Sequence, residues 1–235
     1  MIVVTQARRV GAVLSLLAVL FVLGAPSQAG AAPTPISPFL DDVLSSVDTY
    51  WHQVDAATGR PAPSVQHDWV AVGAKDATGC GASADENAAF YCPTDDTIYV
   101  GQTFASQLYD GTLASLPGQR AGYGRAIGAF AVSYAVAHEY GHNVQQERGV
   151  LGGRRRSLPT ELNADCLAGT WIRWDQGQGK ASDGDVQQAL DAAKAVGDFD
   201  FINPDHHGTP QQRYDAVAKG IKSGDPAACD TYLSM

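Results

Sequence analysis

Apolar side chains recur every three to four residues between Phe39 and Trp51, which is the spacing of one face of a helix. The members of this stripe are Phe39, Leu40, Val43, Leu44, Val47, Tyr50 and Trp51. The pattern predicts a helix that ends before the segment Gly59–Pro63, because its glycine and two prolines do not continue a helix.

The pattern changes between residues 64 and 100 to short runs rich in valine, tyrosine and phenylalanine. Glycine, asparagine, aspartate and proline separate these runs, as they do between strands. We expect strands over 69–74, 88–92 and 97–100, with the turn 93–96 joining the last two, in one small sheet.

Helical patterns dominate the chain after Gly101. One helix is expected over 123–148, closed by Gly149, and another over 159–174, with Ser157 available as its N-cap. Further helices are expected from Ser182, from Thr209 to a stop at Gly220, and in a short last turn after Asp225. Strands followed by helices predict an α+β fold rather than a doubly wound sheet.

The N-terminus has the layout of a secretory signal peptide. Two arginines precede an apolar run over 10–23, and small residues follow it up to Ala31. The run has 14 residues, which is too short for a membrane span of roughly 20. We therefore expect residues 1–31 to be a cleaved signal, and residues 32–235 to form one secreted domain without stable membrane insertion.

The charge of the chain argues against nucleic acid as a partner. Its formal net charge is −9, and removal of the expected signal peptide would take away two arginines and no acid. An acidic surface repels the phosphates of nucleic acids and of anionic lipids. The basic run Arg154–Arg156 is expected to be a solvated loop rather than a docking patch.

Four cysteines, an even number in a chain expected to be exported, favour two disulfides. No two of them have the short spacing of a structural zinc site. Cys80 and Cys92 flank a loop of the expected sheet, whereas Cys166 and Cys229 lie in the helical part. We therefore expect the pairs Cys80–Cys92 and Cys166–Cys229.

The sequence HEYGH at 138–142 places two histidines four residues apart. On a helix, His138 and His142 therefore lie one above the other and can bind one ion. Glu139 is rotated by about 100° from His138, which leaves its carboxylate beside such an ion, where it can act as a general base. Gly141 is costly in a helix, and either a functional site or close packing against another backbone would explain it.

Zinc in a catalytic site needs a third protein ligand. The metzincin pattern is excluded, because Gln145 and Arg148 occupy the positions of its last glycine and histidine. Glu161 lies 19 residues after His142 on an expected helix, and Asp165 lies on the same face, where it could accept a ring N–H of a liganding histidine. A solvated acidic face would also explain the two acids, but their neighbours are mostly apolar.

The segments AHEYGHNVQ, ELNADCLAGTW and HGTPQQR resemble three blocks of the putative neutral zinc metallopeptidase family, a gluzincin-type group. The resemblance covers most of residues 70–230. It implies a zincin-like α+β fold, with a small N-terminal sheet whose edge strand, within 88–100, pairs with extended substrate, followed by a mainly helical part that carries the two motif helices. It also implies one Zn²⁺ ion held by His138, His142 and Glu161, with Glu139 as the general base.

The third block singles out His207 and Arg213. A histidine on a distant loop is the usual oxyanion donor in gluzincins, so the resemblance implies that role for His207. The alternative is a purely polar turn before a capped helix, which is the role expected of His206. Arg213 is expected to hold an acidic residue in place rather than to contact substrate.

These features predict a secreted zinc peptidase that acts on a peptide or protein substrate by means of a zinc-activated water. Two alternatives stay open. One is a zincin-fold binding module without catalysis, against which the intact Glu139 argues, because a binding protein needs no base beside its metal. The other is a zinc amidase that acts on cell-wall peptides.

Overall fold

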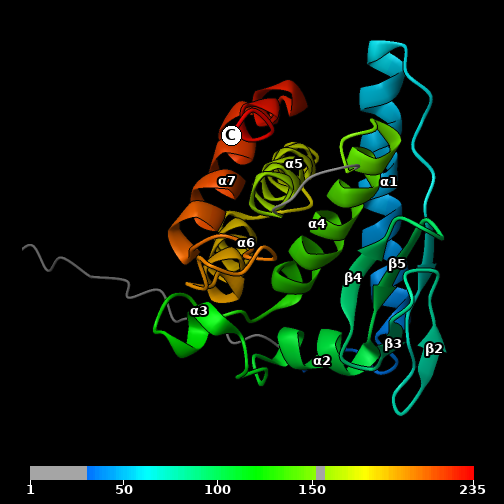
Figure 1. The fold of residues 1–235 in the computed structure, drawn as a ribbon, viewed down its shortest axis with the longest axis vertical. Coiled ribbons are helices and arrows are strands. Elements are labelled where there is room, and N and C mark those ends of the chain that lie inside the picture. Colours follow the sequence, from blue (N-terminus) through cyan, green and yellow to red (C-terminus); the bar gives the residue numbers. More distant parts are fainter. Residues whose placement is uncertain (1–30, 152–156) are drawn as a thin grey trace, which may run out of the picture.

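The computed structural model describes residues 31–151 and 157–235. The signal peptide predicted over 1–31, apart from its last residue, and the basic run Arg154–Arg156 lie outside these residues. The first predicted helix is confirmed as α1 (Ser37–Thr58), which ends at Gly59 in the left-handed conformation. Figure 1 shows α1 standing beside the strands and one long helix of the second half of the chain.

The strands form a three-stranded and a two-stranded sheet. In the larger sheet β5 (Thr97–Val100) lies at the centre, parallel to β1 (Gln66–Asp68) and antiparallel to β4 (Ala89–Cys92). The smaller sheet pairs β2 (Lys75–Ala77) with β3 (Ser83–Asp85). Within residues 31–151 and 157–235, strand β4 pairs only with β5 in this sheet, so one of its edges is open.

The strand predicted over 69–74 is wrong. Val70 is fully buried, but Val72 is 72% exposed, and the chain turns at Gly73, whose φ is +77°. The two neighbouring strands, β1 and β2, lie on either side of this turn. The apolar run resembles a strand in the sequence, but it is the connection between β1 and β2, and the turn at Gly73 reverses the chain between these two strands.

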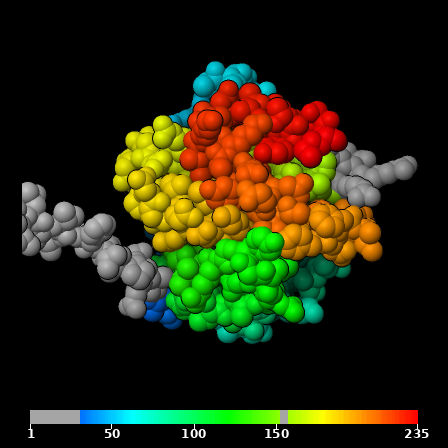
Figure 2. Space-filling view, turned by 90° about the vertical axis from the view of Figure 1, so that its left-hand side faces the viewer, coloured from blue at the N-terminus to red at the C-terminus, as the bar shows by residue number. Residues whose placement is uncertain are grey.

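The second half of the chain is helical, and α5 lies at its centre, packed against α4 and α7 (Figure 1). The elements are α2 (Gln102–Asp110), α3 (Pro117–Arg120), α4 (Ala129–Glu147), α5 (Leu158–Gly177), α6 (Asp183–Val196), α7 (Pro210–Ser223) and the 3₁₀ helix η1 (Pro226–Tyr232). Figure 2 shows the face on which the C-terminal part of the chain, including α7, lies above the segment around α3. The α+β order of strands followed by helices is confirmed.

Three predicted helix ends differ from the structure. Helix α4 begins at Ala129 rather than at residue 123, because Gly128 has a φ of +103°. Ser157 precedes α5 without capping it, and its hydroxyl instead donates to the carbonyl of His206 at 2.9 Å. Gly220 does not end α7, which continues to Ser223.

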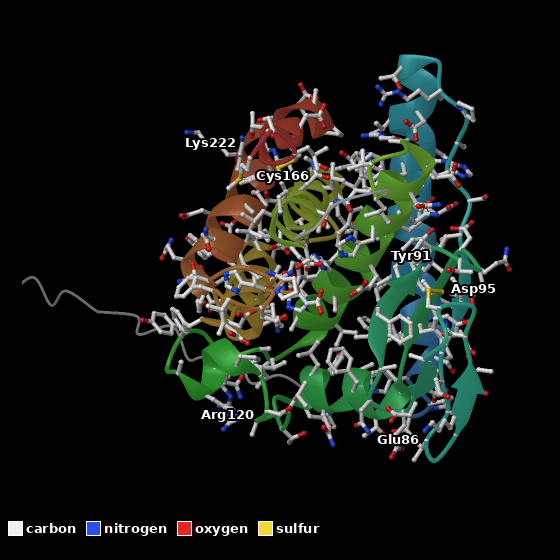
Figure 3. All side chains as sticks on the ribbon, in the orientation of Figure 1. Glu86, Tyr91, Asp95, Arg120, Cys166 and Lys222 are labelled. Atoms are coloured by element: carbon white, nitrogen blue, oxygen red, sulfur yellow. A yellow bond between two sulfur atoms is a disulfide. The ribbon has the colours of Figure 1, made fainter. Side chains whose placement is uncertain are left out.

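One large apolar core joins α1, the larger sheet and helices α2, α4, α5, α6 and α7, and a small second cluster lies between the two sheets. The structure contains the disulfides Cys80–Cys92 and Cys166–Cys229, the pairs expected from the sequence. Cys166 lies beside the C-terminal segment, far from Glu86, which follows β3 at the lower end of the strands (Figure 3). Among the described residues, no helix is long and apolar enough to cross a membrane.

Candidate metal centre

Helices α4 and α5 approach closely enough to place their side chains around one point. A Cβ atom built on Gly141 would lie 3.1 Å from the Cα of Ala164 and 3.2 Å from its carbonyl oxygen. A larger residue at position 141 would therefore push the two helices apart. Close packing against another backbone, one of the two explanations for this glycine, is thus what the structure contains.

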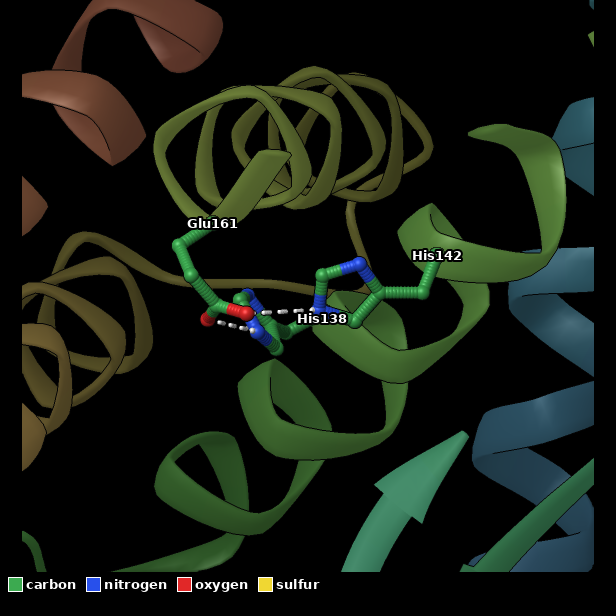
Figure 4. Close-up of side chains that lie close together, drawn as sticks. All are labelled: His138, His142 and Glu161. Atoms are coloured by element: carbon green, nitrogen blue, oxygen red, sulfur yellow. Dashed lines mark ion pairs between the residues drawn. The ribbon is translucent and has the colours of Figure 1, made fainter. Parts of the chain in front are cut away.

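Three side chains meet where these helices cross (Figure 4). The Nε2 atom of His138 lies 3.2 Å from Glu161 Oε2, and the Nε2 atom of His142 lies 3.3 Å from Glu161 Oε1. One nitrogen or oxygen atom from each residue lies within 4.8 Å of the others. Two imidazoles and one carboxylate are the donor set of one class of catalytic zinc sites, so these residues fit a metal ion with one position left open.

A buried network supports His138 from behind. Its Nδ1 lies 2.9 Å from Asp165 Oδ1, the contact expected from the sequence. Arg213 donates two hydrogen bonds to the same carboxylate, from Nε to Oδ2 and from Nη2 to Oδ1, each at 2.8 Å. The hydroxyl of Tyr134 donates to Asp165 Oδ1 at 2.6 Å. Asp165 therefore fixes the orientation of His138, and Arg213 holds an acid in place as expected.

The charges around this network displace several pKa values. Burial alone would raise the pKa of Asp165, but Arg213 and His138 lower it to about 2. Against its burial, the pKa of Glu161 is held well below its usual range by the two histidines. Burial and the nearby guanidinium lower the pKa of His138, but hydrogen bonds to Asp165 and Glu161 outweigh them and raise it to about 10. Protons and a metal ion therefore compete for the same ring nitrogens.

His142 has a different partner, which the sequence analysis missed. Its Nδ1 lies 3.0 Å from Oε1 of Gln145, a residue that is 1% exposed. In the sequence alone, Gln145 serves only to exclude a metzincin. Its spacing of three residues from His142 puts the two on the same side of a helix and was the signal that could have identified it. Tyr134, one helical turn before His138, was missed in the same way.

The three residues open onto a cavity of about 440 Å³. Glu139 lines it beside them, and so do residues 89–91 of the edge strand β4. Tyr91 lies on this strand (Figure 3). The remaining lining residues are an apolar set, Phe104, Pro117, Ala135 and Val196, and a polar set, Tyr134, Asp198, His207 and Arg213. The cavity thus joins the metal-binding group to a strand edge.

His207 lines the same cavity, but its side chain is 53% exposed and its Nδ1 lies 3.6 Å from Asp198. The structure thus brings His207 to the site, although an exposed side chain does not by itself indicate a donor role. His206 is not a simple turn residue. It is 6% exposed, and its Nδ1 pairs with Asp198 Oδ1.

The sequence of this chain is similar to a known protein family and to several bacterial proteins. A family model described as "Putative neutral zinc metallopeptidase" matches residues 23–232. The uncharacterized protein YpfJ of Escherichia coli K12 is 33% identical over 89% of this chain and 78% of its own length. The uncharacterized protein Rv2575 of Mycobacterium tuberculosis is 35% identical over 80% of this chain and 68% of its own. No solved structure matches the chain. The chain therefore belongs to the putative neutral zinc metallopeptidase family.

Proposed function

We propose that this protein is a zinc-dependent peptidase. The observation that carries the proposal is the meeting of His138, His142 and Glu161 in one cavity with Glu139 beside them. The donor set fits a single Zn²⁺, which when bound supplies a Lewis acid that polarises a carbonyl and lowers the pKa of a coordinated water. A site built only to bind a metal would not need the extra carboxylate of Glu139.

The residues of the chain would divide the reaction among them. Glu139 takes a proton from the attacking water on its carboxylate and later delivers it to the leaving amine. The open edge of β4 accepts the backbone of an extended peptide, because residues 89–91 line the same cavity as the metal-binding group. His207 is proposed as a donor to the oxyanion, since it lines the same cavity as the metal-binding group.

The proposal places the enzyme outside the cytoplasm. Residues 1–31 act as the export signal, and residues 32–235 form the peptidase domain. The two disulfides support this location, because such bonds persist in oxidising compartments and are rare in the cytosol. The acidic net charge of the chain is in keeping with a peptide substrate rather than a nucleic acid.

Two substitutions test the assignment. Glu139→Gln should keep one zinc per chain and lose nearly all turnover of a casein or peptide-library substrate, because the base is removed and the ligands stay. Glu161→Ala should lose most of its zinc, because two imidazoles alone hold the ion weakly. Metal analysis of both purified variants, beside the unmodified protein, separates the two roles. Equal zinc in both would exclude Glu161 as a ligand.

The digest also separates the alternatives. Cleavage of peptidoglycan peptides without cleavage of casein would favour the amidase, and stoichiometric zinc with neither activity would favour the binding module. We favour the peptidase because residues of the edge strand β4 line the cavity, and an edge strand can pair with an extended chain.

A further inference from the structure

Gln145 connects the two helices that carry the proposed zinc ligands. Its Oε1 lies 3.0 Å from His142 Nδ1 on its own helix α4. Its Nε2 donates to the carbonyl of Thr160 at 2.7 Å and to Asn163 Oδ1 at 2.9 Å, and both of these residues lie on α5, on either side of Glu161. All three hydrogen-bonding groups of this buried amide are therefore used.

The orientation of this amide is determined by its neighbours. Asn163, which is 1% exposed, donates from Nδ2 to the carbonyl oxygen of Cys229 at 3.0 Å. A carbonyl can only accept, so the Oδ1 of Asn163 must face Gln145. Gln145 then meets two acceptors, Asn163 Oδ1 and the Thr160 carbonyl, and must turn its NH₂ group toward them.

The same logic reaches the metal ligand. Once its NH₂ group is committed, Gln145 presents only an acceptor oxygen to His142. The Nδ1 of His142 must then carry the proton, which leaves the lone pair of Nε2 directed toward Glu161. Along this series, from the Cys229 carbonyl through the two amides to the His142 imidazole, each N–H faces one acceptor. Reversing either amide would place two donors or two acceptors against each other in the buried interior.

We propose that Gln145 is the positioning residue of His142, and that the Cys166–Cys229 disulfide holds Gln145 in register through Asn163. The disulfide joins α5 to η1, the 3₁₀ helix whose Cys229 carbonyl begins the series. The inference rests on the proposed zinc site. It assigns to the disulfide a role in metal affinity as well as in stability, and it distinguishes the two histidines, since a carboxylate orients His138 and a neutral amide orients His142.

The first test compares two buried amides on α4. In the full chain, Gln145→Met should raise the zinc dissociation constant, measured by chelator competition, by about 10- to 100-fold. Asn143→Leu is the matched control, because Asn143 is also buried but bonds to Asp96 and to the Ser64 carbonyl, away from the ligands. It should lower the melting temperature and leave the zinc dissociation constant unchanged. Equal zinc affinity in both variants would overturn the proposal.

A conservative variant separates positioning from packing. Gln145→Glu retains an acceptor for His142 but faces the Thr160 carbonyl and Asn163 Oδ1 with another acceptor. It should therefore melt at a lower temperature than Gln145→Met yet bind zinc more tightly. If affinity instead followed melting temperature across these variants, Gln145 would be only a packing residue.

The second test concerns the disulfide. Removal of the pair Cys166/Cys229 by alanine should weaken zinc binding about tenfold, whereas removal of Cys80/Cys92, which lies in the sheet half, should leave it unchanged. In the Gln145→Met background, removal of Cys166/Cys229 should add little further loss, because both changes break one series. If the two changes instead lowered zinc affinity independently, so that their effects multiplied, the proposed link between the disulfide and Gln145 would be overturned. A wild-type chain that binds no zinc would instead refute the proposed function.

Discussion

Arg213→Met should destabilise the metal-free protein by about 3 kcal/mol, at the lower end of the roughly 3–5 kcal/mol for breaking one side of a buried ion pair. The reason is the burial of the carboxylate that remains. Asp165 is 0% exposed, and Arg213 supplies two of its hydrogen bonds, both 2.8 Å long. Tyr134 and His138 still contact Asp165 after the change, and they limit the loss.

The measurement is the free energy of unfolding in urea at neutral pH with a chelator present, which removes the contribution of bound metal. Arg173→Met is the matched control, because Arg173 is an exposed arginine on α5. It should change stability by no more than about 0.5 kcal/mol. A similar loss in both variants would show that a general loss of charge, and not the buried pair, sets the stability.

A double-mutant cycle gives the decisive result. Asp165→Asn alone leaves the buried Arg213 guanidinium with only the more distant Glu161 carboxylate, 3.8 Å away, as a counter-charge, so it too is costly. The double variant contains neither the guanidinium nor the Asp165 carboxylate, so no member of this ion pair is left without its partner. Its loss should therefore be smaller than the sum of the single losses by about 2 kcal/mol. Additive losses within about 0.5 kcal/mol would refute the view that Arg213 stabilises the fold by neutralising Asp165.

Three further outcomes are expected. The pKa of Asp165 is about 2 in the fold against 3.8 ordinarily, so this carboxylate contributes roughly 2 kcal/mol to the free energy of unfolding above pH 4, and the contribution is lost as pH falls from about 4 to 2. Unfolding of the metal-free protein in acid should show this loss of stability, and Asp165→Asn should remove it. Gly220→Ala should cost roughly 2–3 kcal/mol in urea unfolding, because its new Cβ would lie 2.0 Å from a carbonyl oxygen of α5, whereas Gly177→Ala, which meets nothing within 4 Å, should be neutral or stabilising. His206→Ala should lower the melting temperature because its ring is buried, whereas His207→Ala should leave melting unchanged and lower kcat by about 10²–10³ in a peptide assay; unchanged kcat would exclude His207 as the oxyanion donor.

Features set by local spacing were predictable from the sequence. The α1 stripe, the four-residue spacing of the histidines and the placement of Asp165 one turn after Glu161 all follow from 3.6 residues per turn. Even the crossing of α4 and α5 left a local sign, the costly Gly141. The contact of Arg213 with Asp165 spans 48 residues; the resemblance to the family predicted only that Arg213 holds an acidic residue, and no local pattern shows which one.

Several features that were wrong or missed depend on contacts between distant segments. Gly220 looked like a helix stop because glycine often ends helices, but here it lets α7 pack against the backbone of α5. Ser157 looked like a cap, but its hydroxyl is used by a loop 49 residues later. Gln145 required knowledge of α5, because its role depends on Thr160 and Asn163 as much as on His142.

The arrangement of charge explains why the site combines a buried arginine with a metal-binding group. Asp165 orients His138, but its negative charge would also add to that of Glu161 beside the ion. Arg213 cancels that charge while leaving the carboxylate free to accept the ring N–H. A divalent ion would then meet one anionic and two neutral ligands, so part of its positive charge would remain available to polarise a carbonyl. The neutral amide of Gln145 serves the same end at His142, since it orients the ring without adding negative charge.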